Sequence, residues 1–235
     1  KEMRERILAL VPHITLYSAS PITDWHKQIS LLKQHPEVSA IAAFAQFDAL
    51  ITRGTDIETV RGIGLDPAEE DAFKPLLPHL DAEDAAHFLE QEDGLILGAG
   101  VAQHLGVKVG ERLILIVPPT NKEGQAAPTR FKTVELSAIL NTGTELDQAI
   151  ALVHLTVASD LAGLHGNVSG FRVTTRQLFD VQRIAVGLQD ILPPGFYSTN
   201  WMMTHGNLYS AIQLSRDLIS ILLFSIIGVA AFNVV

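Results

Sequence analysis

Two separated stretches of the chain repeat one pattern of hydrophobic and polar positions. In the first, a strand near His13–Tyr17 precedes apolar residues at helical spacing over Trp25–Leu32, and Ala45–Ile51 then alternates apolar with polar positions. The second repeats this order, with a strand, a helix and a strand predicted at Phe171–Thr175, Val181–Ile191 and Phe196–Trp201. Because two such units commonly pack together, we expect residues 8–62 and 168–203 to form one subdomain.

The middle of the chain predicts a different, β-rich subdomain. Its acidic segments Asp66–Glu70 and Asp81–Glu90 are predicted to be helical, and a short helix is expected over Val101–Leu105. Strands are predicted at Gly94–Gly98, Glu111–Val117, Phe131–Ile139 and Ala149–Val157. The predicted fold class is therefore α+β with two subdomains, the second inserted into the first.

The final segment, Leu218–Val235, is apolar and carries no charge. Its length is at the lower limit for crossing a bilayer, and it lacks the polar face of a globular helix. We interpret it as the start of a transmembrane helix, with a buried C-terminal core helix as the alternative. The preceding residues then belong to a water-soluble domain attached to a membrane.

A segment of thirteen residues separates the two predicted strands Glu111–Val117 and Phe131–Ile139. It is too long for a tight hairpin turn and has no large apolar residue, so it should project from the subdomain. A tolerated surface insertion and a recognition element are both compatible with this composition. As a partner-binding loop it comprises Pro118, Pro119, Thr120, Asn121, Lys122, Glu123, Gly124, Gln125, Ala126, Ala127, Pro128, Thr129 and Arg130.

Composition and motifs exclude several functions. The net charge of −9 disfavours nucleic-acid binding, which depends on Lys and Arg neutralising phosphates. With no cysteine, the chain has neither disulfides nor thiolate sites. It has no zinc-protease helix, nucleophile elbow or phosphate loop, so we expect no cofactor, no metal and no catalytic residues.

Several segments, spread over nearly the whole chain, form a recognisable set of motifs. They are Arg6–His13, Ile96–Ala102, Leu105–Gly110, Thr142–Asp147, Trp201 with Gly206–Gln213, and Gly228–Val235. Together they resemble the LolC/LolE family, the permeases of lipoprotein-releasing ABC transporters. The regions around Asp24-Trp25 and Leu146-Asp147 are more similar to the LolE-type subunit.

This resemblance implies a non-catalytic periplasmic domain of a bacterial inner-membrane permease that passes lipoproteins to a carrier for outer-membrane sorting. The implied partners are a second permease subunit, a cytoplasmic ATPase subunit and lipoprotein cargo, with the periplasmic carrier LolA as a further candidate. It also implies a porter-like subdomain at 1–62 and 168–217, a sabre-like subdomain at 63–167, and the membrane run at 218–235. In LolC-type subunits a proline-flanked hook binds the carrier; residues 118–130 resemble that hook, and Arg130 resembles an assisting basic residue.

Three hypotheses about the function remain. The first is a lipoprotein exporter. The second is a related permease of an efflux system, or one that activates a cell-wall hydrolase. The third, a soluble enzyme, is disfavoured by the missing chemistry. Ile114 stands where a further basic residue is expected for carrier binding, which favours the LolE-type, cargo-binding subunit.

Overall fold

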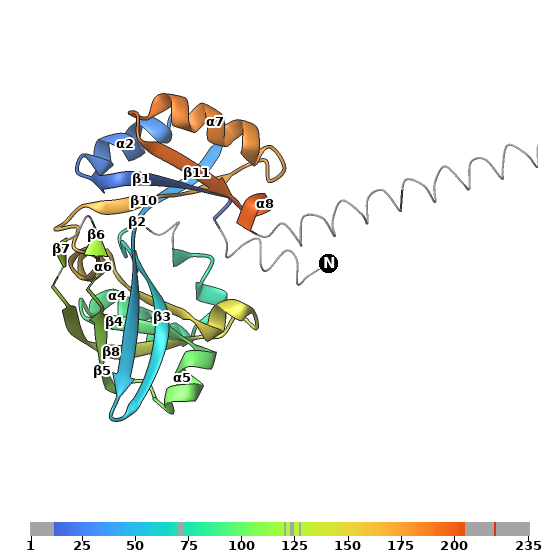
Figure 1. The fold of residues 1–235 in the computed structure, drawn as a ribbon. Coiled ribbons are helices and arrows are strands. Elements are labelled where there is room, and N and C mark those ends of the chain that lie inside the picture. The colour runs from blue at the N-terminus through green and yellow to red at the C-terminus, as the bar shows by residue number, and fades with distance from the viewer. Residues whose placement is uncertain are drawn as a thin grey trace, which may run out of the picture.

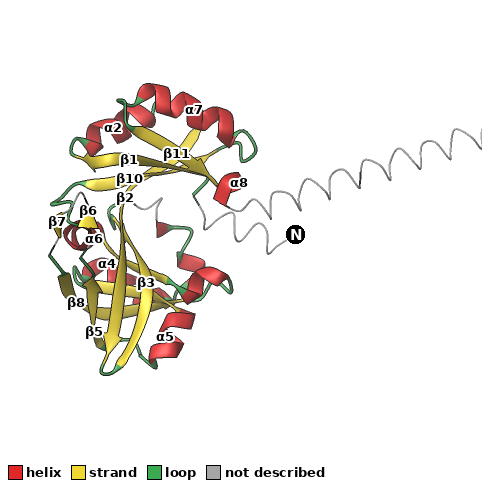
Figure 2. Ribbon diagram, in the orientation of Figure 1, coloured by secondary structure: helices red, strands yellow, loops and turns green. Residues whose placement is uncertain are grey.

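The computed structural model describes residues 12–69, 73–119, 121, 122, 125, 126, 128–204 and 219. Its described strands form one nine-stranded sheet and one two-stranded sheet (Figures 1 and 2). The strands are β1 Ile14–Ile22, β2 Val38–Arg53, β3 Asp56–Leu65, β4 Gly94–Gly98, β5 Arg112–Val117, β6 Asn121–Lys122, β7 Gln125–Ala126, β8 Arg130–Leu140, β9 Ile150–His154, β10 Val168–Thr175 and β11 Phe196–Asn200. The helices are α2 Trp25–Leu32, α4 Ala82–Glu90, α5 Ala99–Leu105, α6 Leu155–Ala162, α7 Val181–Ile191 and α8 Trp201–Thr204, with short 3-10 turns at Leu77–His79 and Glu145–Gln148.

Strands of the two strand–helix–strand units lie side by side in the sheet, although the predicted strand Ala45–Ile51 itself lies in the part of β2 that pairs with β3. Their strands lie in the order β11-β1-β10-β2, and α2 and α7 cover one face of this part of the sheet (Figure 1). Apolar residues at helical spacing face the strands, namely Trp25, Ile29 and Leu32 of α2 and Val181, Ile184 and Leu188 of α7. The chain between β2 and β10 forms the inserted second body. The predicted α+β class is confirmed.

The inserted body is a closed barrel. Its strands run in the order β2-β3-β9-β4-β8-β5, and Leu50–Thr52 of β2 pair with Ile114–Ile116 of β5 to complete the ring. The periodicity predicted for β2 is confirmed, because Ala45, Phe47, Ala49 and Ile51 are all buried inside. Closure leaves no exposed strand edge in this ring, which removes a site of unwanted strand pairing.

The long strand β2 belongs to both bodies. Phe44 pairs with Gly170 of β10 on one side and with Leu65 of β3 on the other. Residues before Phe44 pair with β10 and residues after it pair with β3, so continuous backbone hydrogen bonding joins the four-stranded layer to the barrel. The division of the chain at residues 62 and 167 stays a prediction, and the shared strand shows that β2 itself crosses from one body to the other.

Two local predictions are wrong. Asp66–Glu69 form a turn rather than a helix, because the Asp66 side chain accepts a hydrogen bond from the Ala68 N–H at 2.9 Å. The segment Ala149–Val157 is not one strand: β9 ends at His154 and α6 begins at Leu155. An apolar run of this length does not distinguish a buried strand from a buried helix.

The predicted transmembrane start, Leu218–Val235, lies outside the described residues except for Ile219. None of the helices in the described part is both long enough and apolar enough to span a membrane.

Candidate partner-binding hairpin

The segment between β5 and β8 continues the ribbon that these strands form. β5 and β8 pair from Arg112 with Glu135 up to Val117 with Arg130. Beyond this point Asn121–Lys122 and Gln125–Ala126 pair as β6 and β7. The segment is therefore a hairpin with a paired tip rather than a wholly irregular loop, and Figure 1 draws that tip at the end of the barrel where α6 lies.

The structure describes only some of the predicted site residues. Pro118, Pro119, Pro128 and Thr129 are exposed on the stem of the hairpin, and Arg130 at its base is half-buried. The backbone pairing of β6 and β7 is described, whereas Thr120, Glu123, Gly124 and Ala127 lie outside the described residues. A partner-binding role for these thirteen positions stays a prediction.

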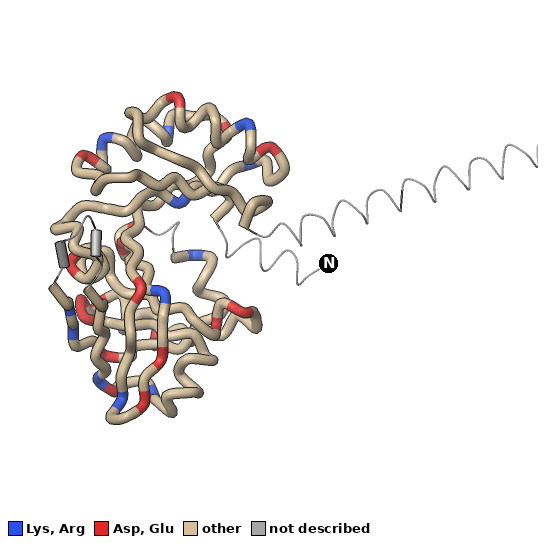
Figure 3. Tube along the Cα trace, in the orientation of Figure 1, with Lys and Arg blue, Asp and Glu red and all other residues tan. Residues whose placement is uncertain are grey.

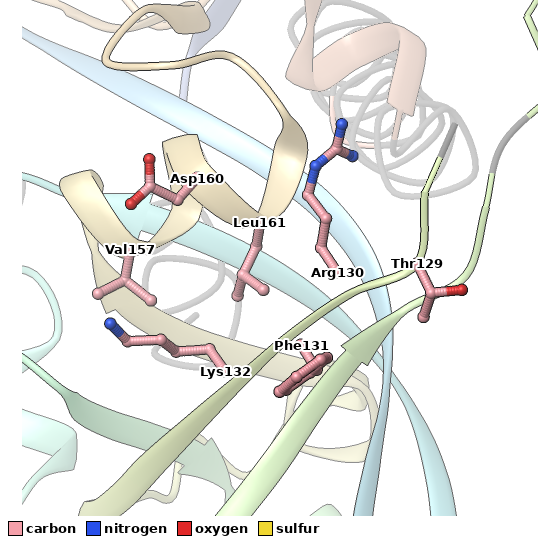
Figure 4. Close-up of a pocket in the computed structure, with 7 residues that line it drawn as sticks. All are labelled: Thr129, Arg130, Phe131, Lys132, Val157, Asp160 and Leu161. Carbon is pink, nitrogen blue, oxygen red and sulfur yellow. The ribbon is translucent and has the colours of Figure 1, made fainter. Parts of the chain in front are cut away.

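The base of the hairpin lies against α6 and forms a cleft that sequence reasoning missed. Thr129, Arg130, Phe131 and Lys132 line one side, and Val157, Asp160 and Leu161 of α6 line the other (Figure 4). The missed residues are separated along the chain, and α6 itself was not predicted. The signal that could have revealed α6 is Gly163, a typical helix C-cap residue.

Gly163 is conformationally and sterically constrained. It closes α6 in the left-handed conformation, with φ of +72°. A Cβ atom added here would overlap the guanidinium of Arg130. The glycine therefore lets the Arg130 side chain lie over the C-terminal end of α6, where a cation also interacts favourably with the helix dipole.

The outer face of the same ribbon is apolar. Ile114 and Ile116 of β5 alternate with the buried residues Leu113, Leu115 and Val117, because successive side chains of a strand point to opposite faces. Phe131 of β8 lies on the same outer face, because it pairs with Ile116. Phe131 is 73% exposed and Ile114 is 42% exposed. The outer face of the ribbon near the hairpin therefore exposes hydrophobic area at Ile114 and Phe131.

The Thr142–Asp147 segment that supported the family resemblance has a structural role. The Asp147 carboxylate accepts hydrogen bonds from the backbone N–H groups of Thr142 and Gly143, at 2.8 to 3.1 Å, and from the Thr142 hydroxyl. These bonds satisfy the carboxylate of a residue that is only 5% exposed. Among the residues that the structure describes, no cluster of three His, Asp or Glu side chains is arranged to hold a metal ion.

No protein-family model matches the chain. Over its full length it is 31% identical to the LolE transmembrane protein of the lipoprotein-releasing system of Haemophilus influenzae, and spans 58% of that relative. It is 27% identical to the LolC protein of Xylella fastidiosa, spanning 57% of it. The chain therefore covers less than two thirds of the length of either relative.

Among solved structures, the periplasmic region of MacB from Actinobacillus actinomycetemcomitans matches 89% of this chain and 98% of its own, with a TM-score of 0.54 and 8% identity. At that identity the likeness concerns the fold alone. The chain is therefore similar along its whole length to a segment of the LolC and LolE lipoprotein-releasing permeases, and it has the fold of the MacB periplasmic region.

Proposed function

We propose that the chain is the periplasmic domain of a bacterial inner-membrane permease that releases lipoproteins from that membrane for transfer to a periplasmic carrier. The observation that carries this proposal is the full-length match to LolE at 31% identity. The shared fold with the MacB periplasmic region supports the periplasmic placement. The complete permease would act with a second permease subunit and a cytoplasmic ATPase subunit.

The role of this domain is to bind and orient proteins rather than to catalyse a reaction. ATP hydrolysis would belong to the separate ATPase subunit. Within the proposed complex, the hairpin at residues 118–130 is the candidate contact element, because its stem is exposed and the exposed Phe131 follows directly after it.

We assign the chain to the LolE type. The LolE relative is 31% identical and the LolC relative 27%. The exposed position 114 on the barrel surface holds isoleucine, where a basic residue is expected for carrier binding. The surface beside the hairpin therefore has one positive charge fewer than that binding would require. On this assignment the domain binds lipoprotein cargo, and its affinity for the carrier LolA is weak.

Binding assays with the immobilised chain test these proposals. The probes are purified LolA, a lipidated lipoprotein and the same lipoprotein without its lipid. We expect binding of the lipidated protein and weak binding of LolA. The hairpin variant replaces Asn121–Ala127 by a short Gly-Ser linker, and its control inserts the same linker at the β2–β3 turn beside Gly54, drawn at the far end of the barrel in Figure 1.

The outcomes test the LolE-type assignment and the lipoprotein-releasing function separately. Tight LolA binding that is lost in the hairpin variant but kept in the control would replace the LolE-type assignment by a LolC-type one. Absence of binding to LolA and to both lipoprotein forms would refute the lipoprotein-releasing function itself.

A further inference from the structure

The outer edge of β11 is open. β11 is the terminal strand of the nine-stranded sheet, and β1 is the strand that pairs with it among the described residues. The Gly195 carbonyl and the Trp201 N–H are hydrogen-bonded to residues in and just before β1, at 3.3 and 3.1 Å. Because peptide groups alternate in direction along an antiparallel strand, those of Phe196, Ser198 and Asn200 point to the outer edge.

The centre of this edge has free hydrogen-bonding groups. The Gln189 side chain donates to the Phe196 carbonyl at 3.3 Å, and the Thr204 hydroxyl donates to the Asn200 carbonyl at 3.2 Å. Between them, the N–H and C=O of Ser198 have no hydrogen-bond partner in the described part of the chain. The edge can therefore bond to a further strand at Ser198.

β11 lacks the features that usually prevent such pairing. Natural proteins protect edge strands with charged residues, proline or a bulge. The segment Phe196–Asn200 has no charged residue and no proline, and Figure 3 draws it entirely in the colour of uncharged residues. Its register with β1 is continuous, without a bulge. These observations indicate an edge that accepts another strand.

The edge is complementary to a second copy of itself. An antiparallel pair with Ser198 opposite Ser198 matches every outward-pointing residue, because Phe196 then lies opposite Asn200. In this register Tyr197, which is 51% exposed, lies opposite Thr199 of the second copy, and aromatic–β-branched pairs stabilise antiparallel strands. A folded β11 is already ordered, whereas a flexible peptide would lose conformational entropy for the same few hydrogen bonds.

An uncharged stripe of α7 lies beside the same edge. Gln182 accepts a hydrogen bond from the Asn200 side chain at 2.9 Å. Because Gln189 bonds to Phe196, both glutamines lie on the side of α7 toward β11. Val186 falls between them at helical spacing and is 52% exposed. The stripe therefore offers an apolar side chain next to the open strand.

The two helices would also meet in such a pair. Helix α7 packs on β11 and β1. Strands pair about 4.8 Å apart, so a two-fold axis beside β11 would place the two α7 helices about 10 Å apart, the spacing of packed helices. Val186 of each copy would then be covered by the other.

We propose that two copies of this chain associate through β11 and α7. Their four-stranded layers join into one continuous sheet, with two backbone hydrogen bonds between the Ser198 residues and with Val186 packed across the two-fold axis. The partner of this surface is a second copy of the chain, so the proposal goes beyond the proposed function and does not depend on it.

Disulfide cross-linking tests the register, because the chain has no cysteine of its own. In the proposed pair the two Ser198 Cα atoms lie about 5.5 Å apart, within disulfide range, whereas the two Thr199 Cα atoms lie about 8 Å apart, beyond it. Under mild oxidation Ser198→Cys should form linked dimers much faster than its neighbour Thr199→Cys. Excess detergent micelles keep the apolar run Leu218–Val235 from joining chains.

Sedimentation equilibrium of the 235-residue chain in the same detergent tests the surface. Val186→Arg should weaken dimerisation at least about tenfold, because two like charges would meet across the axis. Leu31→Arg is the matched control: Leu31 is an exposed apolar residue of α2, which packs on β2, away from the edge. It should leave dimerisation unchanged. Ser198→Pro removes the outward N–H, which edge strands tolerate, and should also weaken dimerisation; thermal unfolding checks that it folds.

Three results would refute the proposal. Equal cross-linking of the two cysteine variants would exclude the register, and equal effects of Val186→Arg and Leu31→Arg would exclude the surface. A chain that stays monomeric would exclude a second copy as the partner and leave an extended segment of another protein as the occupant of the edge. None of these results affects lipoprotein binding, which is measured separately with the lipidated protein.

Discussion

Thr142 donates both its backbone N–H and its hydroxyl to the carboxylate of Asp147, at 3.1 and 2.8 Å. Both residues are buried, so water does not compete for these groups. The carboxylate thereby fixes the loop between β8 and β9, and the Asp147 backbone lies so close to Gly98 that a Cβ at Gly98 would overlap it. The loop therefore packs directly against the end of β4.

We predict that Asp147→Ala lowers the free energy of unfolding by about 3 kcal/mol, because it leaves the Thr142 donors buried without an acceptor. Urea denaturation of the chain measures this. Asp160→Ala is the control: this exposed carboxylate has no hydrogen-bond or ion-pair partner among the described residues, and its loss should change stability by less than about 0.5 kcal/mol. Equal effects of the two substitutions would contradict the prediction.

His13 should make the fold sensitive to acid. Burial lowers its pKa below the ordinary value of 6.5, and the Thr175 N–H donates to its Nδ1 at 3.0 Å, which requires that nitrogen to be unprotonated. The unfolded chain then binds a proton more readily than the folded chain. Stability contributed by neutral His13 is therefore complete above pH 6.5 and is lost as the pH falls toward the lowered folded pKa.

The measurement compares unfolding free energies at about pH 7.5 and about pH 5.5, on either side of the unperturbed histidine pKa. His13→Gln should reduce the loss of stability on acidification. His87→Gln serves as control, because the His87 side chain is exposed. A pH dependence unchanged by His13→Gln would exclude this residue as its source.

Two glycines should respond to alanine with opposite signs. The Phe47 ring covers Gly62 on the paired strand, so a Cβ at Gly62 would overlap the buried ring. Gly62→Ala should destabilise the fold by about 2 kcal/mol through overpacking. Gly187 lies within α7, where an added Cβ meets only ordinary contact, and Gly187→Ala should stabilise by about 0.5 to 1 kcal/mol. Thermal unfolding of both variants decides whether the signs differ.

The hairpin tip should contribute little to stability. Replacing Asn121–Ala127 by a short Gly-Ser linker should change the free energy of unfolding by about 1 kcal/mol or less, because loop-closure entropy varies slowly with length. Leu115→Ala, in the fully buried part of β5 below the hairpin, should cost about 2 to 5 kcal/mol. A hairpin replacement as costly as Leu115→Ala would show that the tip packs against the body of the protein.

Local patterns in the sequence were sufficient to predict most of the helices and strands. The alternation from Ala45 to Ile51 identified β2, and the acidic segment Asp81–Glu90 was expected to be helical. In the structure the Asp81 carboxylate caps α4, because it accepts hydrogen bonds from the N–H groups of Glu83 and Asp84. Such signals depend on residues a few positions apart, so the strand–helix–strand repeat and the α+β class could be predicted without a structure.

The tertiary structure alone decided which strands pair and which side chains meet. β3 pairs with β9 across a long sequence separation, closing of the barrel depends on β5 reaching β2, and β2 serves both bodies. Arg130 and Gly163 are brought together only because α6 packs against the barrel, whereas the apolar run containing Leu155 is ambiguous by itself. The periodicity of a segment indicates which of its residues are buried. It does not indicate which other segment covers them, because hydrophobic burial is non-directional.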